Sequence, residues 1–178
     1  MMRRIAAAAS LVLGLLYATP SRAQDVPYVE LSAGYNFLRY QASDFGVNLP
    51  KGLYGDVAIN LNHAIGVVGV LTSNPIGDIT AVSFMGGLRF SARGFARGPG
   101  RTIGFFQILA GGLGLKEANA TNTDRAVQLG GGANITFTDH AAVRVEADYI
   151  RTFLRENVTI GDNYIRFSIG VMYGFGAH

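Results

Sequence analysis

Apolar and polar residues alternate with a period of two along most of the chain. The stretch VRVEADYIRT at 143–152 sets Val143, Val145 and Tyr149 on one side of a strand and charged residues on the other. Eight such segments are found, each of roughly ten residues, and no long stretch repeats apolar residues at helical spacing. They are 29–37, 53–61, 65–72, 80–90, 105–114, 127–137, 143–152 and 164–175. The pattern predicts an all-β chain of eight strands, in which 65–72 is ambiguous because it is apolar on both faces.

The connections between these segments alternate in length. The ones after the second and sixth segments are short, at 62–64 and 138–140. This alternation predicts an antiparallel up-and-down barrel with both termini in the periplasm, short turns there and longer loops outside. Residues 92–101 are an exception, because they make a long connection on the short-turn side. The predicted outer loops are polar and lie at about 40–51, 73–78, 116–125 and 152–162.

The first 23 residues have the pattern of a secretory signal peptide. Two arginines precede an apolar run at 5–18, and small residues at Ser21 and Ala23 precede a cleavage site before Gln24. A membrane-spanning helix is the alternative, but the run of 14 residues is shorter than the roughly 20 that spanning requires. We therefore expect a signal peptide at 1–23 and a barrel domain at 24–178.

Removal of the signal peptide changes the charge balance. Of 15 Lys and Arg, the signal carries Arg3, Arg4 and Arg22, which leaves 12 against 12 Asp and Glu. The sequence pI of about 9.4 therefore gives no support to a nucleic-acid partner, and we expect none. Export of a chain without cysteine fits a Gram-negative envelope.

Two packings of the strands are possible. With apolar faces inward, the chain would be a soluble periplasmic lipocalin-like barrel with an apolar ligand; with apolar faces outward, it would be a transmembrane barrel with a polar interior. The polar faces are rich in Gly, Ala and Ser and nearly free of Lys, unlike a solvated surface. Aromatic residues near both ends of the apolar faces also favour the membrane, as two girdles. These residues are Tyr35, Phe37 and Tyr149 at the outer end and Phe90, Phe137, Tyr173 and Phe175 at the periplasmic end.

The transmembrane packing would bring seven charged residues into one narrow interior. Buried charges persist only when they are paired, so we expect a hydrogen-bonded ion network. An eight-stranded barrel is just wide enough for side chains to fill it, which argues against an open pore. The expected network residues are Glu30, Asp56, Arg89, Arg144, Glu146, Asp148 and Arg166.

Five further cations fall at the outer ends of strands on the lipid-facing side. At that level they would pair with phosphates of lipopolysaccharide; the alternative is a set of scattered, solvated charges. On the periplasmic side, Arg93, Arg97 and Arg101 in the long turn are expected to be solvated, with inner-leaflet phospholipid or a periplasmic partner as the alternative. The five outer cations are Arg39, Lys51, Lys116, Arg125 and Arg151.

Several stretches resemble the outer-membrane β-barrel domain family, the small eight-stranded OmpA-like or porin-like outer-membrane proteins. They are GYNF at 34–37, GGLRF at 86–90, LGGGANITFTDHAAVRVEADYIRT at 129–152 and NYIRFSIGVMYGFG at 163–176. The resemblance covers 26–175 and implies an outer-membrane location with a structural or surface-interaction role. It also implies that the barrel-assembly machinery recognises the last aromatic residue, here Phe175, although three residues follow it. What the outer loops bind is not indicated.

Neither catalysis nor a cofactor is expected. A lipid-modifying outer-membrane enzyme would need a nucleophile with a base, but only His63, His140 and His178 are available, and the first two fall in short turns. The histidines have no metal-ligand spacing. The glycine-rich stretches at 111–114 and 130–132 do not match a phosphate-binding loop.

Overall fold

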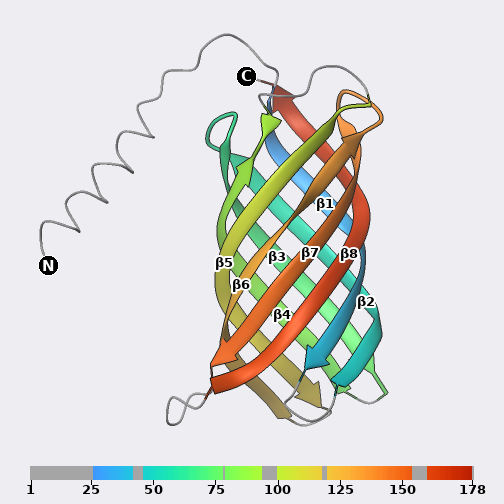
Figure 1. The fold of residues 1–178 in the computed structure, drawn as a ribbon, viewed down its shortest axis with the longest axis vertical. Coiled ribbons are helices and arrows are strands. Elements are labelled where there is room, and N and C mark those ends of the chain that lie inside the picture. Colours follow the sequence, from blue (N-terminus) through green and yellow to red (C-terminus); the bar gives the residue numbers. More distant parts are fainter. Residues whose placement is uncertain are drawn as a thin grey trace, which may run out of the picture.

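In a computed structural model, the chain forms a closed barrel of eight antiparallel strands in which β1 also pairs with β8 (Figure 1). The structure describes residues 26–41, 46–77, 79–93, 100–117, 120–153 and 160–177, so the predicted signal peptide lies outside the described residues. The predicted eight-stranded fold is confirmed. Within the described part, no helix has the length and hydropathy needed to cross a bilayer. The strands are β1 (Pro27–Gln41), β2 (Gly46–Asn60), β3 (Ile65–Ile76), β4 (Ile79–Ser91), β5 (Thr102–Glu117), β6 (Ala120–Thr136), β7 (Ala141–Phe153) and β8 (Ile160–Ala177).

The start of β1 and the end of β8 lie at one end of the barrel, which we call the terminal end; the opposite end is the distal end (Figure 1). Two tight turns close the terminal end. In the first, Oδ1 of Asn62 accepts hydrogen bonds from the backbone N–H groups of Ala64 and Ile65, both at 2.8 Å. In the second, Oγ1 of Thr138 accepts one from the backbone N–H of Ala141 at 2.9 Å. Side-chain acceptors of this kind favour tight turns, and they account for the polar residues found there.

The prediction of long distal loops is wrong. The strands continue through most of the predicted loop residues, and Lys116 pairs in register with Thr121 within the β5–β6 ladder. Strand pairing uses backbone groups, which are the same under polar and apolar side chains. Polar residues therefore mark the end of the apolar band and not the end of the strand. The strand bounds leave only 42–45, 77–78, 118–119 and 154–159 as distal connections.

The apolar faces point outward, as the transmembrane packing requires. Tyr149 is 43% exposed, whereas Arg144 and Asp148 on the other face of β7 are buried. The same holds in β2, where Leu53 is 67% exposed and Asp56 is buried. Exposing apolar surface to water is unfavourable by about 25 cal/mol per Å², so a continuous apolar wall of this kind fits a lipid environment. The soluble packing with apolar faces inward is excluded.

The interior has two parts. Toward the terminal end it is polar and charged, as predicted. Toward the distal end an apolar cluster fills it, which includes Leu38, Leu49, Val70, Leu113, Ile150 and Tyr164. This cluster explains the ambiguous segment 65–72, because β3 supplies buried side chains to the cluster and exposed ones to the outer wall.

A close approach between β1 and β8 depends on glycine. Gly34 and Gly170 are paired in register, and Tyr54 of β2 lies against both. A Cβ atom added to Gly170 would lie 2.6 Å from the Tyr54 hydroxyl oxygen and 2.8 Å from the Cα atom of Gly34. Inward-facing glycines therefore give the room that a narrow barrel needs for one large side chain.

We expect Gly170→Ala to lower the free energy of unfolding by about 1–3 kcal/mol, because the added methyl group forces backbone atoms apart. Gly69→Ala is the matched control, since a Cβ atom there meets nothing within 4 Å, and it should change stability by less than about 0.5 kcal/mol. Urea unfolding in detergent micelles measures both, and equal midpoints for the two variants would contradict this account.

Candidate functional site

The first of two charged groups in the interior joins β1, β2, β4 and β7. Arg144 donates to both carboxylate oxygens of Asp56 at 2.9 and 2.8 Å, and to Oε2 of Glu30 at 2.9 Å. Arg89 donates to Oδ1 of Asp56 at 3.2 Å. The centroid of the Phe105 ring lies 4.8 Å from the Arg89 guanidinium carbon and 5.0 Å from that of Arg144. The ring face therefore makes cation–π contacts with both arginines.

The second charged group joins β6, β7 and β8. Arg166 donates to Oδ2 of Asp148 through Nε at 3.0 Å and Nη2 at 2.7 Å, and to Oε1 of Glu146 at 3.5 Å. Gln128 donates to Oδ1 of Asp148 at 2.9 Å. Two carboxylates thus share one guanidinium group, which leaves this group with a formal charge of minus one.

Gln107 connects the two groups. Its Oε1 accepts hydrogen bonds from Arg89 at 3.1 and 2.9 Å, and its Nε2 donates to Oε1 of Glu146 at 2.6 Å. An amide is suited to this position because it accepts on one side and donates on the other. All seven predicted network residues are therefore brought together in one set of hydrogen bonds that involves every strand except β3.

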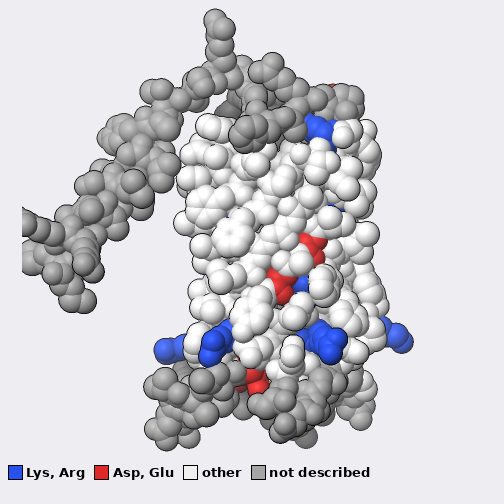
Figure 2. Space-filling view, viewed as in Figure 1, with Lys and Arg blue, Asp and Glu red and all other residues white. Residues whose placement is uncertain are grey.

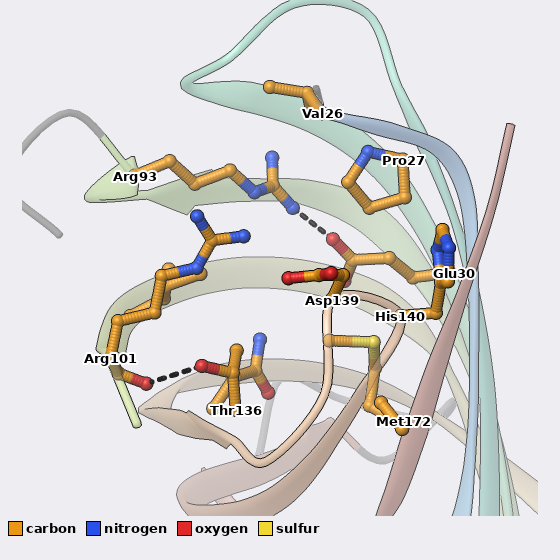
Figure 3. A pocket seen from close by; sticks show the side chains of 12 residues that line it. Val26, Pro27, Glu30, Arg93, Arg101, Thr136, Asp139, His140 and Met172 are labelled. Atoms are coloured by element: carbon orange, nitrogen blue, oxygen red, sulfur yellow. Dashed lines mark hydrogen bonds and ion pairs between the residues drawn. The ribbon is translucent and has the colours of Figure 1, made fainter. Parts of the chain in front are cut away.

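Arg93 is a network member that the sequence analysis placed wrongly. Instead of being solvated in the long turn, its side chain is buried and is paired with Glu30 and with Oδ1 of Asn60 (Figure 3). The physical reason is charge balance. The predicted set holds four carboxylates and three guanidinium groups, and Arg93 makes it four of each among the described residues. Its position in a turn hid it, although the inward parity of Arg89 and Ser91 continues to Arg93.

Three amides of the network were also missed by the sequence prediction. Gln107, Gln128 and Asn134 face inward on β5 and β6, but neutral side chains give no charge to count. Asn134 accepts from Nε of Arg144 at 2.7 Å. Their inward parity was the available signal, and each adds a hydrogen bond to a charged group that already has an ion pair.

Little space remains inside the barrel. At the terminal mouth, the pocket beside Glu30, Arg93 and Arg101 holds about 30 Å³ (Figure 3), enough for about two water molecules. In the distal part, between Leu38, Leu113 and Ile150, no space of the size of a water molecule is left. Of the other turn arginines, Arg101 is half-buried and Arg97 lies outside the described residues. Nor do three or more His, Cys, Asp or Glu side chains gather as a metal site within the described ranges.

The five outer cations all lie on outward-facing positions of the distal part of the barrel. Four are exposed and Arg151 is half-buried. Figure 2 shows Lys and Arg residues gathered at one level near the lower, distal end; above them most of the wall is white, with a few charged atoms visible at mid-height and near the top. None of them forms an ion pair with another described residue, since the ion pairs found there all lie inside the barrel.

The predicted girdle residues lie on the outer wall. Of the outer set, Tyr35 and Tyr149 are exposed and Phe37 is half-buried. The terminal-end set is exposed throughout, at Phe90, Phe137, Tyr173 and Phe175. Tyr173 and Phe175 pack together with ring centroids 4.8 Å apart. Other exposed aromatic residues include Phe84, midway along β4, and Phe106, which is opposite Phe90 on β5.

The fold of this chain is similar to that of several solved structures. No protein-family model and no curated protein matches this chain. Its structure is similar to Neisserial surface protein A (TM-score 0.63, 10% identity, 83% of this chain and 97% of that chain). It is also similar to Ail, the attachment invasion locus protein of Yersinia pestis, in complex with the heparin analogue sucrose octasulfate (TM-score 0.52, 15% identity, 83% and 97%). Ail in a phospholipid bilayer nanodisc gives a TM-score of 0.50 at 16% identity, over 84% of this chain and 100% of that chain.

These matches define the class of architecture as the small eight-stranded barrel of outer-membrane proteins. The resemblance predicted from the sequence is confirmed at the level of the fold. At identities this low, the likeness describes how the strands are arranged and leaves the activity to be argued from the residues of this chain.

We expect Arg144→Ala to lower the free energy of unfolding by about 3–5 kcal/mol, because it leaves the buried Glu30 and Asp56 carboxylates without their main partner. The control is Arg39→Ala, which removes an exposed arginine and should change stability by less than about 0.5 kcal/mol. The urea midpoint is the measurement. An unchanged midpoint in Arg144→Ala would mean that the ion network does not hold the barrel together.

Proposed function

We propose that this protein is exported by its signal peptide and serves as a closed, non-catalytic barrel of the Gram-negative outer membrane, with a structural or surface-interaction role. The observation that carries the proposal is the filled interior inside an apolar wall. Side chains occupy the polar terminal part, and the distal pocket between Leu38, Leu113 and Ile150 has no room for water. A solute would have to displace paired charges and then cross a dry segment, and both steps are unfavourable.

The distal end faces the cell exterior in this proposal. An even number of strands puts both strand termini on one side, which is the periplasmic side in barrels of this type. Connection length does not decide the orientation, because the distal connections are overall no longer than those at the terminal end. The exposed Phe175 near the end of β8 is the aromatic residue that the barrel-assembly machinery would recognise.

We expect the protein to fractionate with the outer membrane, to require detergent for extraction and to migrate differently on gels before and after boiling. Purified barrel added to planar lipid bilayers should produce no stable conductance steps, because the interior is filled. A soluble form obtained without detergent would overturn the membrane assignment. Reproducible channel openings would overturn the closed interior while leaving the location intact.

Lipopolysaccharide is the partner we propose for the outer wall. Arg39, Lys51, Lys116, Arg125 and Arg151 are at the distal level, and cations at the surface of a bilayer attract phosphorylated headgroups. The structure of Ail in complex with a heparin analogue makes polyanionic glycans a second candidate for the same cations. The apolar wall next to them, on the side of the terminal end, favours a ligand with acyl chains.

Replacing all five cations by glutamine should reduce the lipopolysaccharide that co-purifies with the barrel severalfold, because all five charges that attract phosphorylated headgroups at this level are lost. Quantitative phosphate and fatty-acid analysis of the purified protein measures this. Gel mobility that still shifts on boiling serves as the control for folding. Unchanged co-purification would refute the contact.

A further inference from the structure

A polar patch interrupts the apolar outer wall where β6, β7 and β8 reach the distal end. It contains Arg125, Arg151 and Asn163. Arg151 is directly opposite Val127 on β6 and Asn163 on β8, and Arg125 is two residues beyond Val127. Diagonal neighbours on adjacent strands lie roughly 7–8 Å apart, so two guanidinium groups on long side chains can reach one small anion between them.

The patch offers mainly hydrogen-bond donors. Nε of Arg151 is buried and has no hydrogen-bond partner. The Tyr149 hydroxyl donates to Oδ1 of Asn163 at 2.7 Å, which occupies the oxygen of that amide and leaves its NH₂ group to donate elsewhere. No described carboxylate pairs with either arginine, and both nearby aspartates, Asp124 and Asp162, are on inward-facing positions of their strands.

The surroundings of the patch indicate where its anion comes from. Val127, Tyr149 and Phe153 are each about two-fifths exposed, and they border the two arginines on the same outward face. Arg151 lies two residues beyond Tyr149 toward the distal end, where Figure 2 shows the level of Lys and Arg residues. Donors at the edge of an apolar wall suit an anion attached to acyl chains, because a free anion gains nothing from the apolar neighbours.

We propose that Arg125 and Arg151, assisted by the Asn163 amide, form a clamp for one phosphate group of a phosphorylated glycolipid of the lipid A class. The proposal rests on the proposed lipopolysaccharide contact and names which of its five cations hold the phosphate. A guanidinium group donates two parallel hydrogen bonds to phosphate, whereas a lysine acts as a point charge. Lys51 and Lys116 therefore contribute general attraction, and the two arginines fix the position of the headgroup.

The test is native mass spectrometry of the detergent-solubilised barrel with diphosphoryl lipid A, fully dephosphorylated lipid A and inorganic phosphate as separate probes. R125Q/R151Q should weaken diphosphoryl lipid A binding about a hundredfold, or about tenfold for each lost charge-assisted interaction. R125K/R151K keeps the charge but loses the two-donor geometry, and it should weaken binding about tenfold. K51Q/K116Q removes the same charge at the same end of the barrel and should weaken binding only about twofold to threefold.

Each outcome decides a different point. If R125K/R151K binds as tightly as the unchanged protein, or K51Q/K116Q loses as much as R125Q/R151Q, the clamp is overturned and a diffuse basic surface remains. If the unchanged protein binds dephosphorylated and diphosphoryl lipid A equally, the lipopolysaccharide contact itself fails. Inorganic phosphate should not compete; if it displaces lipid A at equal concentration, the lipid source is wrong. All variants should keep the shift in gel mobility on boiling, because the substituted side chains lie on the outer wall.

Discussion

The fold depends on the pairing of buried charges inside a narrow barrel. Charged groups removed from water must be neutralised by partners, because leaving one unpaired costs several kcal/mol. Here four carboxylates and four guanidinium groups meet inside the barrel, and amides add hydrogen bonds to their ion pairs. Since the partners come from seven of the eight strands, the charges reach balance only when the whole barrel has closed. The buried charges can therefore be paired only in the closed barrel.

Apolar side chains fill much of the distal interior. Leu38, Leu49, Leu113 and Ile150 pack as an ordinary apolar core, enclosed by a wall that is itself apolar on the outside. The distal interior also holds buried polar residues such as Asn36, Asn74 and Thr72, so the apolar cluster shares this part of the barrel with them. Together the two halves block the axis twice, once with paired charges and once with hydrocarbon, which supports a role carried by the outer surface and not by transport through the centre.

Period-two alternation predicted the strands, their number and the inward or outward direction of nearly every residue. It did so because one face of each strand meets lipid and the other meets a packed interior, and these environments select opposite side chains. The seven charged network residues followed from the same parity. Strand ends did not follow, because beyond the apolar band both faces of a strand are polar while backbone pairing continues, as at Lys116 and Thr121.

Some features of the site were not predicted from the sequence, and the reasons are physical. Gln107 is neutral, so nothing in a count of charges marks it as the connection between Arg89 and Glu146. Arg93 follows β4 in a predicted turn, where no strand direction was assigned. Two signals pointed to it: the inward parity of Arg89 and Ser91 continues to residue 93, and four acids stood against three bases. Arg125 and Arg151 were placed on the outer wall correctly, but their closeness depends on the register between β6 and β7, which alternation alone does not give.

The position of Arg93 has a consequence for engineering. Connections between strands are the usual sites for inserting peptides or displayed epitopes, because they tolerate added length. The β4–β5 connection, the longest on its side, invites such use, yet its second residue after Ser91 belongs to the ionic core through Glu30 and Asn60. A graft that begins before Arg93 would pull a cation out of the barrel, whereas one that begins after it leaves the interior complete.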